Sequence, residues 1–364
     1  MNNQRGLDKE HAILKKLMTN GEYEYITQIV QDSSNEYWLG IRNDSVMLYY
    51  MGGKILEIDA DGGLSLDRNY VLRLGETVDF DLDKMTLEDW KRNEGMLRKA
   101  VQCFQTGEYE NPSFKADKHL ERISEQEFMM QNNRLNSDWY LIDMEYSVEG
   151  LGYGRFDMIG LSKKKGPDGK HKLALIELKS GILAIKGRLE YDKKEKNKLK
   201  NFGSGVAGHI VNYFNFLHSP DGTKNVERLA EEVSTMISNY HALGLNMDIP
   251  QIYKTDISCE PGQVKCLLVI SDLCNNKEKI SALKTVKHYL FEDEDDKTIA
   301  KDNAEVNWEK VKVFNKNASS FAEDYSKLNM KIYLCNDERN IQEKEARKLN
   351  LEELKEWIKE LKTE

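Results

Sequence analysis

The 364 residues, 40% hydrophobic and 32% charged, have the balance of a globular protein long enough for two or three packed units. The formal net charge of −9 argues against a protein that coats nucleic acid non-specifically, and five cysteines without a CxxC pair exclude a disulfide framework or zinc knuckle. The sequence has neither an apolar run long enough to cross a bilayer nor a signal peptide, so we expect a cytoplasmic protein without a membrane partner.

The first elements suggest a small antiparallel unit. A short charged helix is expected over residues 11–18, and residues 36–59 alternate three short apolar runs with the turn sequences RNDS and MGGK. This pattern predicts a β-meander that serves packing, partner binding or dimerisation. With the helix that follows, it makes up a predicted N-terminal unit over residues 1–110.

Two amphipathic helices are expected next, over residues 86–104 and 116–133, because their apolar residues return every three or four positions. The segment between them contains Gly and Pro and is typical of a domain boundary. Residues 111–364 are therefore predicted to form the second domain, with an α/β C-terminal extension.

Three strands in succession are predicted in the central block, over residues 139–148, 155–162 and 172–181. A long, mostly helical region is expected over residues 187–245. Two buried strands, at residues 264–272 and 330–337, then alternate with helices over residues 279–290 and 350–361. This order indicates a mixed α/β (α+β) fold with a mixed sheet flanked by helices.

Charged side chains converge in the central block. Asp157 interrupts one apolar strand, and Glu177 and Lys179 lie two residues apart in the next, so that they project from the same face. Two converging carboxylates supply the hard oxygen ligands that Mg²⁺ or Mn²⁺ prefers, and such a cation can polarise a phosphoryl oxygen and activate water. Burying carboxylates among apolar residues is costly unless they are paired or metal-bound, which favours a functional interpretation.

Asp157, followed after a hairpin by Glu177-Leu178-Lys179, resembles the PD-(D/E)XK nuclease superfamily, the restriction-endonuclease-like fold. The resemblance covers residues 116–217, and Phe156 replaces the usual proline. It implies that Asp157, Glu177 and Lys179 are catalytic, that Asp157, Glu177 and the Leu178 carbonyl hold Mg²⁺ or Mn²⁺, and that Lys179 assists the attacking water. It also implies a helix–three strands–helix–strand core.

Further metal ligands are expected on two neighbouring elements. Many members of the superfamily carry an acidic residue on the first core helix, and Glu127 is our choice because it shares a helical face with Ile123 and Met130. Asp143 and Glu145 share a strand face, and Glu145 is preferred because it lies nearer the turn. Surface charge for Glu127, and an ion pair with Arg155 for Glu145, are the alternatives.

Nucleic-acid contacts are predicted around this centre. Residues 162–200 contain 13 Lys or Arg against 5 Asp or Glu. His209 and Asn212 share a helix face with Tyr213 that could touch the scissile phosphate, although a lone histidine is more often structural. The candidate nucleic-acid-binding residues are Lys163, Lys164, Lys165, Lys186, Arg188, His209 and Asn212.

The sequence therefore predicts a Mg²⁺-dependent endonuclease that hydrolyses phosphodiester bonds, with DNA favoured over RNA. A role in defence against phage or mobile elements is suggested by the superfamily's frequent occurrence there. A homodimer would allow both strands to be cut. The alternative is a catalytically inactive module of the same fold that binds nucleic acid or a protein partner.

Overall fold

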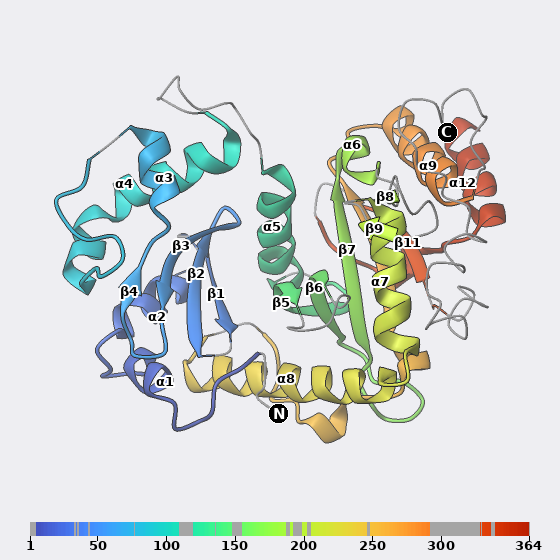
Figure 1. Cartoon of the computed structure of the whole chain (residues 1–364). Helices are drawn as coiled ribbons and strands as arrows, with labels where there is room; N and C mark the ends of the chain where they lie inside the picture. Colours follow the sequence, from blue (N-terminus) through green and yellow to red (C-terminus); the bar gives the residue numbers. More distant parts are fainter. Residues whose placement is uncertain are drawn as a thin grey trace. The chain divides into compact units, whose positions relative to one another are not determined.

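The computed structural model (Figure 1) contains two compact units. The first unit comprises Met1–Asn136, Tyr140–Met144 and Leu229–Asp256, and the second comprises Ser137–Trp139, Glu145–Arg228 and Ile257–Glu364. The predicted division after residue 110 falls at residues 109–118, which lie outside the described residues. The structure describes residues 5–32, 34, 36–42, 44–75, 77–108, 119–134, 136–147, 155–186, 190–191, 199–201, 205–245, 248–291, 328, 330–335 and 339–363.

The first unit contains an antiparallel sheet whose strands follow chain order, which confirms the predicted meander. Met51 and Gly52 both have positive φ, 49° and 74°, as a two-residue hairpin turn requires. A side chain at Gly52 would collide with the Arg122 carbonyl. The short fourth strand has no counterpart in the prediction. The strands are β1 Tyr37–Arg42, β2 Ser45–Tyr50, β3 Gly53–Ile58 and β4 Leu64–Ser65.

Helices complete the first unit. The expected helix at residues 86–104 is α4, which begins with a capping box between Thr86 and Asp89 and ends at Gly107, whose φ is 70°. The helices are α1 Ala12–Leu17, α2 Glu24–Gln31, α3 Arg68–Leu74, α4 Leu87–Thr106, α5 Leu120–Arg134, the second half of α8 Gly222–Ala242, and the 3-10 turn Lys254–Asp256.

A buried ionic cluster lies in the first unit, around the fully buried Asp143. Arg5 donates from Nε to one Asp143 oxygen at 2.7 Å, and Arg42 donates to the other. Arg42 also donates to the Tyr49 hydroxyl and the Met144 carbonyl. Asp143 is therefore the counter-charge of two buried guanidinium groups.

A six-stranded sheet has the order β12-β11-β10-β7-β6-β5, and all of its strands except the middle of β5 belong to the second unit. Strand β6 is antiparallel to β7, β10 is parallel to both β7 and β11, and β12 is antiparallel to β11. The predicted strands are thereby confirmed. They are β5 Trp139–Ser147, β6 Arg155–Ser162, β7 Leu173–Ser180, β10 Lys265–Ser271 and β11 Met330–Leu334, with β12 Arg347–Lys348 in addition.

Helix α7 lies along β7 (Figure 1), and α9 packs against α12. The expected helical region at residues 187–245 is wrong near its start, where two short strands, β8 (Glu190–Tyr191) and β9 (Leu199–Asn201), pair with each other. The elements are α6 Gly181–Ile185, β8 Glu190–Tyr191, β9 Leu199–Asn201, α7 Val206–His218, α9 Asn276–Phe291, α12 Leu351–Thr363, and 3-10 turns at Pro261–Gln263 and Glu343–Glu345.

Candidate active site

The candidate site begins where the pairing of β6 with β7 ends. Regular pairing runs from Leu161 opposite Leu173 to Met158 opposite Ile176. Beyond it, the Asp157 carboxylate accepts a hydrogen bond of 2.8 Å from the Leu178 backbone N–H. A side chain therefore replaces a backbone acceptor at this point, and it fixes the Asp157 carboxylate beside β7.

Glu177 and Lys179 project from β7 next to Asp157, as the two-residue spacing predicts. The Lys179 Nζ lies 2.5 Å from Glu177 Oε1 and 3.8 Å from Asp157 Oδ2. The side chains of Glu177, Lys179 and Asp157 are 1%, 3% and 14% exposed. One ammonium group thus lies between two carboxylates in an almost fully buried setting, where charge interactions are strong.

Helix α7 supplies the other partners of Glu177. His209 Nδ1 lies 2.8 Å from Glu177 Oε2, and the fully buried Tyr213 hydroxyl donates to the same oxygen at 3.0 Å. The two residues are four apart, so they share one face of the helix. Both oxygens of Glu177 are consequently held by side chains from two different elements.

These contacts shift the ionisation of the cluster. Burial alone would raise the pKa of Glu177, but the positive charge of Lys179, then that of His209, outweighs it and lowers the pKa from 4.5 to about 2. Burial would lower the pKa of His209, whereas the Glu177 charge raises it on balance. Burial and the nearby carboxylates raise the pKa of Tyr213 well above its usual value. Glu177 is therefore an anion at neutral pH.

This ionisation predicts a pH dependence of stability in metal-free protein. Because the pKa of Glu177 is about 2 in the folded chain and 4.5 as its ordinary value, its stabilising contribution is present above pH 4.5 and is lost as pH falls towards 2. We expect the difference in unfolding free energy between wild type and Glu177→Gln to shrink over that interval. Urea unfolding in chelator at several acidic pH values measures it, and a constant difference would contradict the assignment.

Phe156 explains why a residue other than proline precedes Asp157. Its fully buried ring packs on Tyr146, Tyr213 and Phe216, with ring centroids 5.8, 5.1 and 4.9 Å apart. Two of these partners lie on α7. The contact fixes α7 against β6, so the residue before the aspartate positions the helix that holds Glu177.

Glu127 and Glu145 remain predicted metal ligands. Glu127 is half-buried on α5 of the first unit. The inward face assumed for α5 is wrong, because Ile123 and Met130 are only half-buried while Phe128 and Met129 are fully buried. Glu145 is half-buried with a φ of 52°, which breaks the regular alternation on which a face shared with Asp143 depends.

The structure describes six of the seven predicted nucleic-acid-binding residues. Lys164, Lys165 and Lys186 are exposed, and Lys163 is half-buried at the β6–β7 hairpin. Asn212 is half-buried one position before Tyr213 on α7, whereas Arg188 lies outside the described residues. His209 differs from these, because its Nδ1 contacts Glu177.

Tyr213 is the site residue that the prediction underrated. The sequence places Tyr213 on the face of His209, but it gives no reason to choose it over Asn212 as a polar contact. The sequence feature that could have identified Tyr213 is its four-residue spacing from His209, which places both side chains on the face of α7 that contacts β7. Only the packing of α7 on β7 shows that the hydroxyl reaches Glu177.

A divalent cation fits the centre by the chemistry of its donors. Asp157 and Glu177 supply carboxylate oxygens, and the ammonium of Lys179 already lies between them as a positive charge. Among the described residues, there is no group of three or more His, Cys, Asp or Glu side chains arranged to hold a metal. The protein therefore offers two carboxylates, with the Leu178 carbonyl a predicted third donor, which suits Mg²⁺ because it usually keeps several waters.

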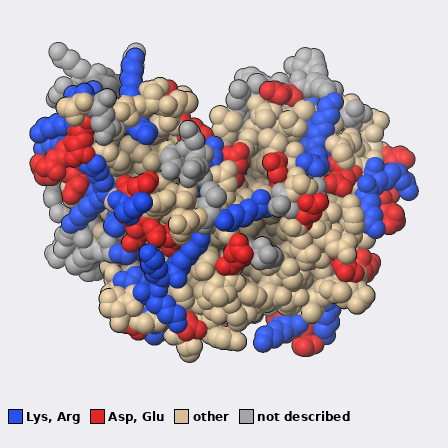
Figure 2. Space-filling view, turned by 180° about the vertical axis from the view of Figure 1, so that it is seen from behind, with Lys and Arg blue, Asp and Glu red and all other residues tan. Residues whose placement is uncertain are grey.

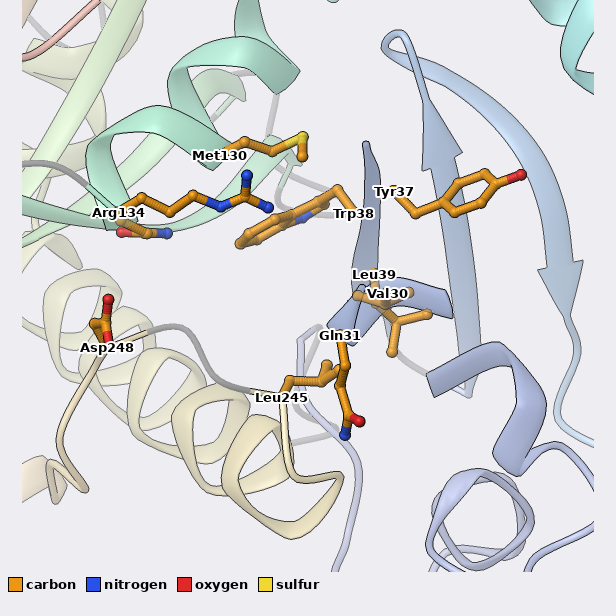
Figure 3. Close-up of a pocket in the computed structure, with 10 residues that line it drawn as sticks. Val30, Gln31, Tyr37, Trp38, Leu39, Met130, Arg134, Leu245 and Asp248 are labelled. Atoms are coloured by element: carbon orange, nitrogen blue, oxygen red, sulfur yellow. The ribbon is translucent and has the colours of Figure 1, made fainter. Parts of the chain in front are cut away.

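A separate pocket belongs to the first unit (Figure 3). It has a volume of about 290 Å³ and lies between β1, the end of α5 and the segment after α8. Trp38 and Leu39 line it together with two exposed charged residues, Arg134 and Asp248. None of the predicted site residues lines this pocket.

Comparison of the chain with protein-family models, curated proteins and solved structures gives no match. The chemistry of the site therefore rests on its own geometry. Within the described part of the chain, no helix has both the length and the apolar character needed to span a membrane.

Proposed function

We propose that this protein is a metal-dependent nuclease with a restriction-endonuclease-like core, and that it hydrolyses phosphodiester bonds in DNA at Asp157, Glu177 and Lys179. The observation that carries the proposal is the buried contact of one ammonium with two carboxylates, at the end of a strand pair and beside a helix. Buried, perturbed carboxylates of this kind cluster at catalytic centres.

Each residue has a distinct role in this proposal. Asp157 and Glu177 would hold Mg²⁺ or Mn²⁺, and the bound cation would supply Lewis-acid activation of the phosphate and of the attacking water. Lys179 places a positive charge beside the reacting phosphate and stabilises the negative charge that develops there. The Leu178 N–H orients Asp157, while His209 and Tyr213 orient Glu177.

Cleavage of labelled nucleic acids tests this function. Linear, nicked and single-stranded DNA, together with RNA, are incubated with the protein in Mg²⁺, in Mn²⁺ and in chelator. We expect metal-dependent shortening of DNA, and stronger cleavage of DNA than of RNA. Intact products in every lane would contradict the proposal and favour a non-cleaving binding module.

Tyr213→Phe isolates the hydroxyl that orients Glu177. The phenyl ring keeps its packing on Phe156, so we expect the unfolding free energy to fall by about 1.5–3 kcal/mol, the range for a hydrogen bond to a charged group. Cleavage should slow by roughly ten- to a hundredfold if a comparable energy is lost in the transition state. Urea unfolding and single-turnover cleavage measure the two effects, and Tyr253→Phe, at an exposed tyrosine, is the control.

A further inference from the structure

Three lysines lie side by side on the strands at one edge of the second unit's sheet. Lys265 begins β10, Lys331 lies in β11 and Lys348 in β12. Leu267 pairs with Lys331, and Lys331 pairs with Lys348. Paired residues, and residues two apart in one strand, share a face of the sheet, so the three side chains point to the same side.

Lys172 extends this set to a fourth strand. It directly precedes β7, where its carbonyl accepts from the Ser162 N–H at 2.8 Å and so continues the pairing of β6 with β7. Ala174, two residues later, pairs with Lys265. Lys172 therefore shares the face of Lys265, and the four lysines form a diagonal row across β7, β10, β11 and β12, which we call the lysine row.

The lysine row lies on the face of the sheet opposite to α7, the helix that contributes His209 and Tyr213 to the candidate site. Glu177 contacts α7 and pairs with Leu268, so Leu268 points to the α7 side of the sheet. Leu267 is the next residue in the strand and therefore points to the opposite side, which is the side of the lysines. On β12, Arg347 lies over the Trp357 ring of α12, so Lys348 points to the opposite side. Figure 2 shows the face opposite to the one seen in Figure 1. On this face, Lys and Arg side chains are interspersed with Asp and Glu side chains.

The lysine row is not neutralised by ion pairs of its own. Within the part of the chain that the structure describes, none of the four ammonium groups forms an ion pair. Burial is the largest influence on the pKa of Lys265 and lowers it; the charge of Glu343 comes next and opposes this, and the charges of Lys172 and Lys331 lower the pKa further. Like charges opposite each other, as at Lys331 and Lys348, destabilise a strand pair. A bound anion would remove this repulsion.

The spacing of the row suits an extended anion. Neighbouring strands lie about 4.8 Å apart, so a diagonal row over four strands spans on the order of 15–20 Å. A single carboxylate or phosphate would meet one or two of these lysines. A polymer with a charge at every residue can meet all four, and flexible lysine side chains bind phosphates as point charges.

We propose that Lys172, Lys265, Lys331 and Lys348 bind the phosphate backbone of double-stranded DNA away from the cleavage site. The choice of DNA over other polyanions rests on the proposed nuclease function. This contact carries no base specificity, since phosphates are the same at every step. It anchors the protein on its substrate and makes affinity depend on salt.

The salt dependence of binding tests the lysine row. Anisotropy of a fluorescent duplex is measured in chelator, so that nothing is cleaved, between about 50 and 200 mM KCl. Each lost phosphate contact makes the negative slope of log affinity against log salt less steep by about 0.9. We expect Lys265→Gln/Lys331→Gln to reduce its steepness by roughly 2, and the exposed Lys348→Gln alone by about 1.

Lys284→Gln/Lys359→Gln is the matched control, with the same charge change at two exposed lysines on α9 and α12. Equal slopes for both double variants, or no duplex binding by wild type, would overturn the lysine row. Circular dichroism confirms that the variants fold. If Lys265→Gln/Lys331→Gln makes the salt dependence less steep but the wild type shows no metal-dependent cleavage, the lysine row is supported and the nuclease proposal fails. If the wild type cleaves DNA but the salt dependence is unchanged in this variant, the nuclease proposal is supported and the lysine row fails.

Discussion

Replacing Glu177 by Gln is expected to reduce metal-dependent cleavage by roughly three orders of magnitude, in line with the loss of a main electrostatic group of an active site. The amide keeps the shape of the side chain but removes the charge that Lys179 and His209 neutralise. It also offers a metal only one neutral oxygen. Single-turnover rates with a labelled duplex in saturating Mg²⁺ measure the loss.

Folding of this variant has to be checked, because Glu177 and Lys179 are both buried. Removing one partner of a buried pair can cost about 3–5 kcal/mol. Asp157→Asn is the second variant, since this side chain is 14% exposed and asparagine can still accept from the Leu178 N–H. If both variants are folded and cleave at the wild-type rate, the site is wrongly assigned.

Replacing Asp143 by Asn is expected to lower the unfolding free energy of the first unit by about 3–5 kcal/mol. The substitution leaves Arg5 and Arg42 buried with no carboxylate between them. Chemical denaturation together with amide hydrogen exchange, which resolves the first unit from the second, measures the effect.

Two variants separate burial of charge from loss of a contact. Asp83→Asn breaks an exposed pair with Arg68 in the same unit and should cost under about 1 kcal/mol. A triple variant, Arg5→Met/Arg42→Met/Asp143→Leu, removes all three charges and should be more stable than Asp143→Asn. A triple variant that is less stable than the single one would show that the cluster itself stabilises the fold.

Local patterns predicted the regular elements well. The meander and α4 follow from apolar periodicity, turn residues and a capping box, all of which act over a few residues. The convergence of Asp157 with Glu177 and Lys179 also follows from a hairpin and a two-residue spacing. These features depend on residues close together along the chain, so a single amino-acid sequence is sufficient to predict them.

Features that depend on distant segments were not predictable. Asp143 and Glu145 occupy similar positions in the same strand sequence, but Asp143 forms ion pairs with Arg5 and Arg42, which are more than a hundred residues away along the chain. The inward face of α5 could not be found from spacing, because polar side chains such as Glu125 are buried there. Tyr213 gained its role from tertiary packing.

Titration of the metal-free protein with Mn²⁺ by calorimetry tests most directly whether Asp157 and Glu177 bind a catalytic cation. The account predicts saturable binding by wild type that Glu177→Gln and Asp157→Asn each weaken by at least about tenfold, the lower bound for perturbing a metal site. Tyr253→Phe should bind as wild type does. Absence of saturable binding by wild type, or equal binding by all four proteins, would contradict it.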